Sequence, residues 1–361
     1  MTEQITLDNL DDFATGATVL GTGGGGDPYI GTLMARQAIK KHGPVELLDP
    51  EDIPADELVV PSAMLGAPTV MVEKLPRGSE STDAFEALET YMGQEAYATM
   101  SIEAGGLNST VPIAVAAELE IPLVDADGMG RAFPEVQMVT MTMGGISATP
   151  MSIADEKGNS VFLETQDNQW AEQFARTTSI EMGGSCMIAT YAHTGAELRE
   201  HAILNSMSLA REIGETIRTA KTDSADPVEE LLKLTDGFEL FEGKILDVER
   251  RTEGGFAVGE ATIDGMQSYE GRSLQLDFQN ENLVARDSER GVVASVPDLI
   301  TVLDAETGDP ITTEGLQYGH RVRVVGMPCA EQWRTDAGLD LVGPRYFDYD
   351  IDYKPIENLQ S

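Results

Sequence analysis

Short apolar runs alternate with helical patterns over the first half of the chain. Helical spacing and flanking signals predict helices at 27–41, 81–92, 109–118 and 168–177. Apolar runs predict strands at 58–65, 98–102, 122–124, 136–141 and 161–164. This alternation is typical of helices packed on a sheet, so we predict an α/β layer arrangement.

The pattern changes in the second half. An apolar strand is predicted at 185–191, a long helix with a regular apolar stripe at 196–220, and a short helix at 228–234. From Phe238 onward, turns rich in Gly and Asp separate runs that predict strands at 243–248, 255–262, 273–278, 283–285, 299–303 and 320–325. This part of the chain is expected to form antiparallel β structure.

Length and composition fit two folded units. The chain has 361 residues and an apolar fraction of 41%, enough for two domains with cores of their own. We expect an α/β N-terminal domain with a mixed sheet and flanking helices over residues 1–180. A mostly β C-terminal domain, which begins with one strand and the long helix, is expected over residues 181–361.

The charge balance is strongly acidic. The chain carries 62 Asp and Glu against 24 Lys and Arg, a formal net charge of −38, and the acids are spread along nearly its whole length. Arginines outnumber lysines by 16 to 8. A diffuse acidic excess with few lysines is typical of proteins that work in molar salt, where screening makes self-repulsion tolerable. We expect a halophilic protein, with an ordinary acidic protein as the alternative.

The same composition limits the partners and the location. A chain without a basic stripe is unsuited to nucleic acid or to an anionic membrane surface. No apolar run reaches the roughly 18 residues that span a bilayer, and the N-terminus lacks signal-peptide features. We expect a cytoplasmic protein with a small-molecule substrate, and a homo-oligomer is an open alternative. With Cys186 and Cys329 as its only cysteines, the chain has no disulfide framework.

The most unusual local feature is a glycine-rich run at residues 21–26, followed by Asp27-Pro28. It contains the Gly-x-Gly-x-x-Gly spacing of dinucleotide-binding loops, but the residues before it, 7–20, have the spacing of a helix and not of a strand. Asp27 would also repel a phosphate. We expect the run to bring backbone amides close to a substrate, the donors being Gly23, Gly24, Gly25 and Gly26. A tight bend between helices and a nucleotide site are the alternatives.

Two further polar segments follow predicted strands, where α/β folds place ligand sites. In the first, Glu103 precedes a close-approach loop with Gly105 and Gly106, and Asn108 lies at the start of the next predicted helix. A carboxylate beside exposed backbone amides suits both substrate binding and proton transfer. These residues are therefore candidates for the site.

The second segment, residues 124–135, contains two acids and one arginine. Asp125 and Asp127 point the same way if extended geometry persists, a spacing that suits a divalent metal or a pair sharing one proton. In the alternative, one carboxylate caps the next helix and the other pairs with Arg131. The sequence leaves both open.

A third segment contains a cysteine and a histidine. Cys186 follows a Gly-Gly turn as a strand begins, where a thiolate can lie near backbone donors. An inert buried side chain is the equally weighted alternative. His193, at the end of this strand, is the only one of the 4 histidines beside such a segment.

Residues 20–29, 103–108, 125–135 and 183–186 together resemble the S-methyl thiohydantoin desulfurase-like family. The resemblance runs over nearly the whole chain and implies an α/β N-terminal domain and a C-terminal domain that ends in β structure. It also implies a hydrolase that converts an S-methyl thiohydantoin to the hydantoin and methanethiol. A non-catalytic or accessory subunit of a hydantoinase/oxoprolinase-type assembly is the alternative.

Displacing methylthiolate from a C=N carbon requires a nucleophile, a stabiliser of charge on the ring nitrogen, and a proton donor or metal. The candidate catalytic residues are Cys186, Asp127, Glu103 and His193. The candidate substrate-binding residues are Gly23, Gly24, Gly25, Gly26, Gly105, Gly106, Asn108 and Arg131, and the candidate ligands of a divalent metal are Asp125 and Asp127. Water activated by the acids or by a metal is favoured, with Cys186 as ligand or nucleophile.

Overall fold

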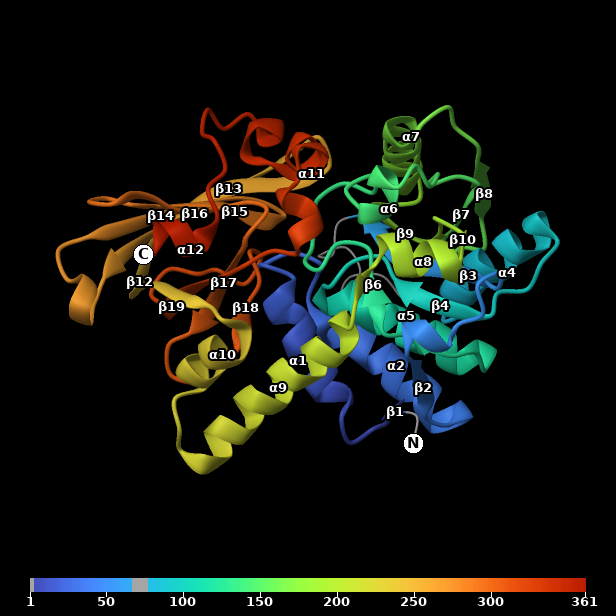
Figure 1. Ribbon diagram of the computed structural model, residues 1–361, viewed down its shortest axis with the longest axis horizontal. Coiled ribbons are helices and arrows are strands. Elements are labelled where there is room, and N and C mark those ends of the chain that lie inside the picture. Colours follow the sequence, from blue (N-terminus) through green and yellow to red (C-terminus); the bar gives the residue numbers. More distant parts are fainter. Residues whose placement is uncertain (1–2, 67–76) are drawn as a thin grey trace.

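The computed structural model describes residues 3–66 and 77–361. Figure 1 shows one sheet with its helices in one half of the molecule and a second sheet in the other half. Among the described residues, no helix is both long enough and apolar enough to cross a membrane.

The first sheet is mixed. Within the described residues its nine strands run in the order β1 (Glu3–Ile5), β2 (Val45–Leu48), β5 (Leu123–Val124), β4 (Ala98–Ser101), β3 (Leu58–Gly66), β9 (Ser185–Ala189), β7 (Met151–Ala154) and β8 (Ser160–Leu163), with β10 (His193–Thr194) paired to β3. The central pairs β2·β5, β5·β4 and β4·β3 are parallel, and the other pairs are antiparallel. The predicted mixed sheet is confirmed. The domain boundary after residue 180 stays a prediction, and β9, which follows it, lies inside this sheet.

Helices cover both faces of this sheet. Among the residues that the structure describes, the helices of this half, together with the two that lead to the second sheet, are α1 (Leu10–Leu20), α2 (Pro28–His42), α4 (Glu80–Met92), α5 (Gly106–Leu119), α6 (Thr140–Met143), α7 (Asn168–Glu181), α8 (Gly195–His201), α9 (Ser206–Asp223) and α10 (Pro227–Thr235), with a 3-10 turn at Pro50–Asp52. On β3, Met64 packs with Leu107 of α5, whereas Leu65 belongs to the core that contains Ala175 of α7. Because successive strand residues face opposite sides, α5 and α7 lie on opposite faces.

The second sheet is antiparallel, as predicted. Within the described residues its eight strands run in the order β16 (Gly291–Ser295), β15 (Glu281–Asp287), β14 (Ser273–Gln279), β13 (Phe256–Gly265), β12 (Phe238–Glu253), β19 (Arg321–Met327), β17 (Leu299–Asp304) and β18 (Pro310–Ile311). The remaining helical segments of this half are Gln267–Tyr269, Glu331–Arg334, α11 (Asp336–Val342), Pro344–Phe347 and α12 (Ile356–Leu359). The C-terminal part is therefore mostly β structure.

Two predicted elements are wrong. The predicted strand at 136–141 is absent: residues 136–139 form no strand, with the Val136 amide donating to Glu172 at 2.9 Å, and α6 begins at Thr140. The predicted helix at 196–220 is interrupted after α8. Ile203 and Leu204 form β11, which pairs with β6 (Ala126–Asp127), and α9 begins only at Ser206. The apolar stripe continued through the break, so spacing alone did not reveal it.

Candidate active site

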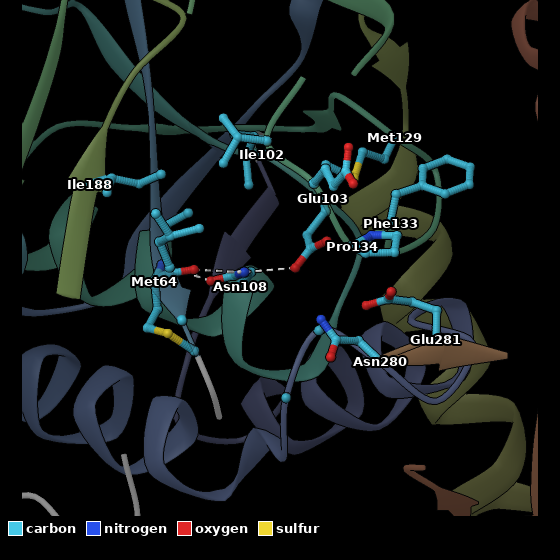
Figure 2. A pocket seen from close by; sticks show the side chains of 18 of the residues that line it. Met64, Ile102, Glu103, Asn108, Met129, Phe133, Pro134, Ile188, Asn280 and Glu281 are labelled. Atoms are coloured by element: carbon cyan, nitrogen blue, oxygen red, sulfur yellow. Dashed lines mark hydrogen bonds between the residues drawn. The ribbon is translucent and has the colours of Figure 1, made fainter. Parts of the chain in front are cut away.

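A cleft enclosing about 690 Å³, part of it open to solvent, lies where the two halves meet. Its walls come from the end of β3, the loop after β4, the glycine run and the hairpin between β14 and β15. The lining also includes the apolar side chains of Leu65, Ile102, Met129, Phe133 and Ile188. Figure 2 shows Glu103, Asn108, Asn280 and Glu281 around the same space.

The glycine run forms one wall of this cleft. Gly23, Gly25 and Gly26 have φ of 88°, 67° and 77°, a region that residues with a Cβ rarely adopt. Its carbonyls bind to both halves of the protein: Leu107 donates to Gly25 and Thr313 donates to Gly23, each at 2.8 Å. The run is thus fixed between the start of α5 and the second sheet.

Gly105 and Gly106 allow this close approach. A Cβ on Gly105 would lie 2.7 Å from the Cα of Gly25, and a Cβ on Gly106 would lie 2.6 Å from the carbonyl oxygen of Gly26. Neither residue is among the described residues that line the cleft. Their position supports the glycine run from behind.

Glu103 enters the cleft from the loop after β4. Its Oε1 accepts a hydrogen bond from Nδ2 of Asn108 at 2.7 Å, and Asn108 is itself fixed by both backbone groups of Met64. Burial raises the pKa of Glu103 to about 7, although the Asn108 amide and the Phe133 backbone amide favour the charged form. Glu103 can therefore both accept and donate a proton near neutral pH.

Glu281 enters from the other half of the molecule, as the first residue of β15, and its side chain is 2% exposed. Its Oε2 is buried without a hydrogen-bond partner among the described residues. Burial raises the pKa of Glu281 well above its usual value and Glu103 raises it further, while Arg131 and the Gly25 amide lower it. Figure 2 shows its carboxyl pointing toward Glu103.

Sequence reasoning missed Glu281. It lies 178 positions after Glu103, between two asparagines at the edge of a predicted strand, and no motif there indicates chemistry. The only faint signal was a glutamate where the strand pattern of the second half calls for a buried residue. Glu281 reaches the cleft because the two halves of the protein pack together, and a single sequence does not show that packing.

Arg131 lies behind the cleft and is fully buried. All its N–H groups donate to the protein: to the carbonyls of Ala132, Pro297, Asp298 and Asn282 and to the Thr22 hydroxyl, at 2.8 to 3.2 Å. Burial lowers the pKa of Arg131 to about 10, an effect that Glu281 opposes most strongly. Arg131 is not among the described residues that line the cleft; it connects the two halves and supplies positive charge near Glu281.

Asp125 and Asp127 serve different elements. The Asp125 carboxylate accepts from the amide and hydroxyl of Ser208 in the first turn of α9. Oδ2 of Asp127 accepts from the amides of Met129 and Gly130 at 2.9 and 2.7 Å, and burial raises the pKa of Asp127 to about 6. Within residues 3–66 and 77–361, no group of three or more His, Cys, Asp or Glu side chains is arranged to hold a metal. These two carboxyls do not fit a shared divalent ion.

Cys186 and His193 lie apart from each other. Cys186 pairs with Leu65 across β9 and β3, and its Sγ contacts the Leu65 carbonyl at 3.8 Å, two residues along the strand from the cleft wall at Ile188. His193 pairs with Val59 at the opposite end of β3, and burial lowers its pKa. The fold thus gathers Glu103, Asn108 and the glycine run, but leaves His193 and Asp125 elsewhere.

Comparisons with known proteins agree with this architecture. The family model "S-Me-THD-like, N-terminal domain" matches residues 8–165, and "S-Me-THD-like, C-terminal domain" matches residues 166–356. No curated protein matches the chain. A crystal structure described as a protein from Chromobacterium violaceum has a TM-score of 0.81 at 22% identity, covering 98% of this chain and 100% of that one. At this identity the likeness shows the fold alone.

Proposed function

The chain belongs to the S-Me-THD-like family, and on that basis we propose that it is a hydrolase of small cyclic amides or thioamides. The specific reaction proposed is conversion of an S-methyl thiohydantoin to the hydantoin and methanethiol. A cytoplasmic location in a salt-rich cell is the setting that we propose for it, in keeping with the net charge of −38.

One observation carries the proposal: two buried carboxyls, Glu103 and Glu281, enter one cleft from different halves of the protein. Burial raises the pKa of each, and the like charge of Glu103 raises the pKa of Glu281 further. Groups of this kind are suited to share a proton and to act as an acid and a base in the same site. Because the two carboxyls titrate as a coupled pair, we assign each a role as acid or base in a given step, and no fixed charge.

In the first proposed step, protonated Glu281 donates its proton to the ring nitrogen of the C=N bond. The carbon between the two ring nitrogens becomes more electrophilic, and the Glu281 carboxylate faces the N–H that has formed. Water then attacks this carbon while the Glu103 carboxylate takes one of its protons. The result is a tetrahedral carbon that bears OH and S-methyl, with Glu103 protonated.

In the second step, the C–S bond breaks and methylthiolate takes the proton from Glu103, leaving as methanethiol. The hydroxyl on the ring carbon gives its proton to Glu281, and its oxygen becomes the carbonyl oxygen of the hydantoin. Both carboxyls are then back in their starting protonation states. The sum is one water consumed, one C–S bond broken and one C=O bond formed. Asn108 has a positioning role, because its amide holds Oε1 of Glu103.

The apolar wall suits the leaving group. Ile102, Met129 and Phe133 line the same cleft, and these side chains give a methylthio group a dry contact surface and limit the entry of bulk water. The amides of Gly23 and Gly26 are the proposed donors to the ring carbonyl, because the Gly24 amide donates to the Gly21 carbonyl and the Gly25 amide to Glu281. The proposal assigns no step to Cys186 or His193.

Release of thiol from S-methyl thiohydantoins, read with a chromogenic disulfide, tests this function. We expect turnover by the wild type and a loss of about 10²- to 10⁴-fold in kcat for Glu103→Gln and Glu281→Gln, the range for general acid-base groups. Glu306→Gln is the matched control, because Glu306 is exposed on the same half as Glu281. A wild type that releases no thiol from any such ring would favour the accessory-subunit alternative.

A further inference from the structure

We infer, resting on the proposed function, that the cleft binds its ring as a cation: a cyclic amidine, isothiourea or guanidine held as an amidinium-type ion between Glu103 and Glu281. The substrate class is then defined by an N–C–N unit that can carry positive charge. Hydantoin, which has no basic C=N nitrogen, and anionic rings are excluded from tight binding, whereas a neutral S-methyl thiohydantoin becomes such a cation when it takes the proton of Glu281.

The charges around the cleft favour a cation. Its lining includes the four carboxyl side chains of Glu103, Glu135, Glu281 and Glu314. Among the described lining residues, the only cationic side chain is that of Arg176. An anionic ring would therefore meet a net negative surface on entry.

The guanidinium of Arg176 is already engaged. It forms an ion pair with Glu172, donates to the Pro134 carbonyl at 3.0 Å and lies over the ring of Phe256, 4.3 Å from its centroid. Arg131, behind the cleft, has all its donors bound to the protein. Neither arginine is thus poised to receive an anionic substituent.

Glu281 provides the specific evidence for a ligand. Its Oε2 is buried, has no hydrogen-bond partner among the described residues, and belongs to a carboxyl that lines the cleft. A buried carboxylate oxygen without a donor costs free energy until something donates to it. Cationic N–H groups make stronger hydrogen bonds to carboxylates than neutral ones do.

The geometry of an amidinium ion matches two separate acceptors. Its two N–H bonds lie in one plane and diverge, so one nitrogen can donate to each carboxyl. Glu103 and Glu281 enter from different halves of the cleft, as Figure 2 shows. The apolar side chains of Ile102 and Met129 then face the rest of the ring.

Binding of a cation should remove a proton from the carboxyls of Glu103 and Glu281. Burial raises the pKa of both carboxyls, and the charge of Glu103 raises that of Glu281 further, so the empty cleft retains protons at neutral pH. A cation binds the ionised carboxylates and must displace a proton, so its affinity rises with pH. A neutral ring that hydrogen-bonds to a protonated carboxyl displaces none.

Isothermal titration of the wild type with 2-aminoimidazoline, a cyclic guanidine that is cationic at neutral pH, tests the inference, with hydantoin as the neutral ring of the same size. We expect 2-aminoimidazoline to bind at least about tenfold more tightly. Titration in two buffers of different ionisation enthalpy should report proton release. Glu281→Gln should weaken the cation by about tenfold or more, and Glu306→Gln should leave its affinity unchanged.

Equal or tighter binding of hydantoin, or cation binding without proton release, would overturn the inference. Both measurements use the wild type, so they decide the matter even if Glu281→Gln fails to fold. No thiol is formed in this experiment. Thiol release without cation binding would contradict only this inference. Cation binding without thiol release from any S-methyl thiohydantoin would contradict only the proposed desulfurase reaction.

Discussion

The carboxyl of Glu281 occupies the space that a side chain on Gly24 would need: a Cβ there would lie 2.0 Å from Oε1 of Glu281. The glycine run and the second sheet therefore fit closely at this contact, in addition to the hydrogen bond from Thr313 to Gly23. Gly24 is required for a neighbour's position and not for its own backbone angles, since only Gly23, Gly25 and Gly26 of the four have positive φ.

Replacing Gly24 by alanine should displace the Glu281 carboxyl and leave the fold intact, because the atoms it meets are the end of one side chain. We expect thiol release to fall by about 10²-fold or more, the value of a misplaced acid or base. Gly25→Ala is the contrast: its Cβ would lie 2.5 Å from the Cα of Gly105 at a φ of 67°. That variant should lose stability, by at least about 1–2 kcal/mol for the strained backbone alone. Denaturant titration of both proteins separates the two effects.

Glu103 should make the protein less stable as pH rises. Its pKa is about 7 in the folded state against an ordinary value of 4.5, so the folded state binds the proton more tightly than the unfolded one. Its stabilising effect is fully present below about pH 4.5 and is lost as pH rises through 7. The difference corresponds to about 3 kcal/mol. As pH rises from about 4.5 to above 7, the free energy of unfolding of Glu103→Gln should increase by about that much relative to wild type, measured by urea unfolding at each pH. Stability curves of the two proteins that run parallel over this pH range would contradict the prediction.

Arg131 should matter for stability across the junction of the two halves. Arg131→Met removes the hydrogen bonds to Thr22 and to carbonyls such as that of Asn282, and it leaves those acceptors buried. We expect a loss of about 3–5 kcal/mol in the free energy of unfolding. Arg321→Met is the control, since Arg321 is exposed with only a 3.9 Å ion pair, and it should change stability by less than about 0.5 kcal/mol.

Cys186→Ala should retain thiol release. Its sulfur contacts the Leu65 carbonyl on the strand beside the cleft, and the proposed steps need only water and two carboxyls. We expect kcat within about threefold of wild type and a stability loss of about 1 kcal/mol. A drop in kcat of about 10³-fold or more, with normal circular dichroism, would restore the nucleophile hypothesis.

Salt should stabilise the protein. With a formal net charge of −38, self-repulsion in the folded state is strong at low ionic strength and is screened within about 3 Å at molar salt. The melting temperature should therefore rise with KCl up to molar concentrations. A melting temperature that is independent of KCl would contradict the halophilic interpretation.

The order of elements was largely readable from the sequence because local patterns encode it. Apolar runs predicted the core strand β3, and Asp27-Pro28 marked the start of α2, where the Asp27 carboxylate accepts from the Tyr29 amide at 2.8 Å. Two-residue strands such as β10 and β11 carry no period that a pattern can show. They form only because a neighbouring segment offers backbone partners.

The sequence by itself determined the α/β and β halves, the strongly acidic surface, the glycine run and the candidacy of Glu103 and Asn108. Only the tertiary structure decided that Glu281 faces Glu103, and that the hydrogen bonds of Arg131 join the two halves. The reason is physical: helix and strand periods depend on residues a few positions apart. The pKa of a buried carboxyl depends instead on which distant groups the packed sheets bring within a few ångströms.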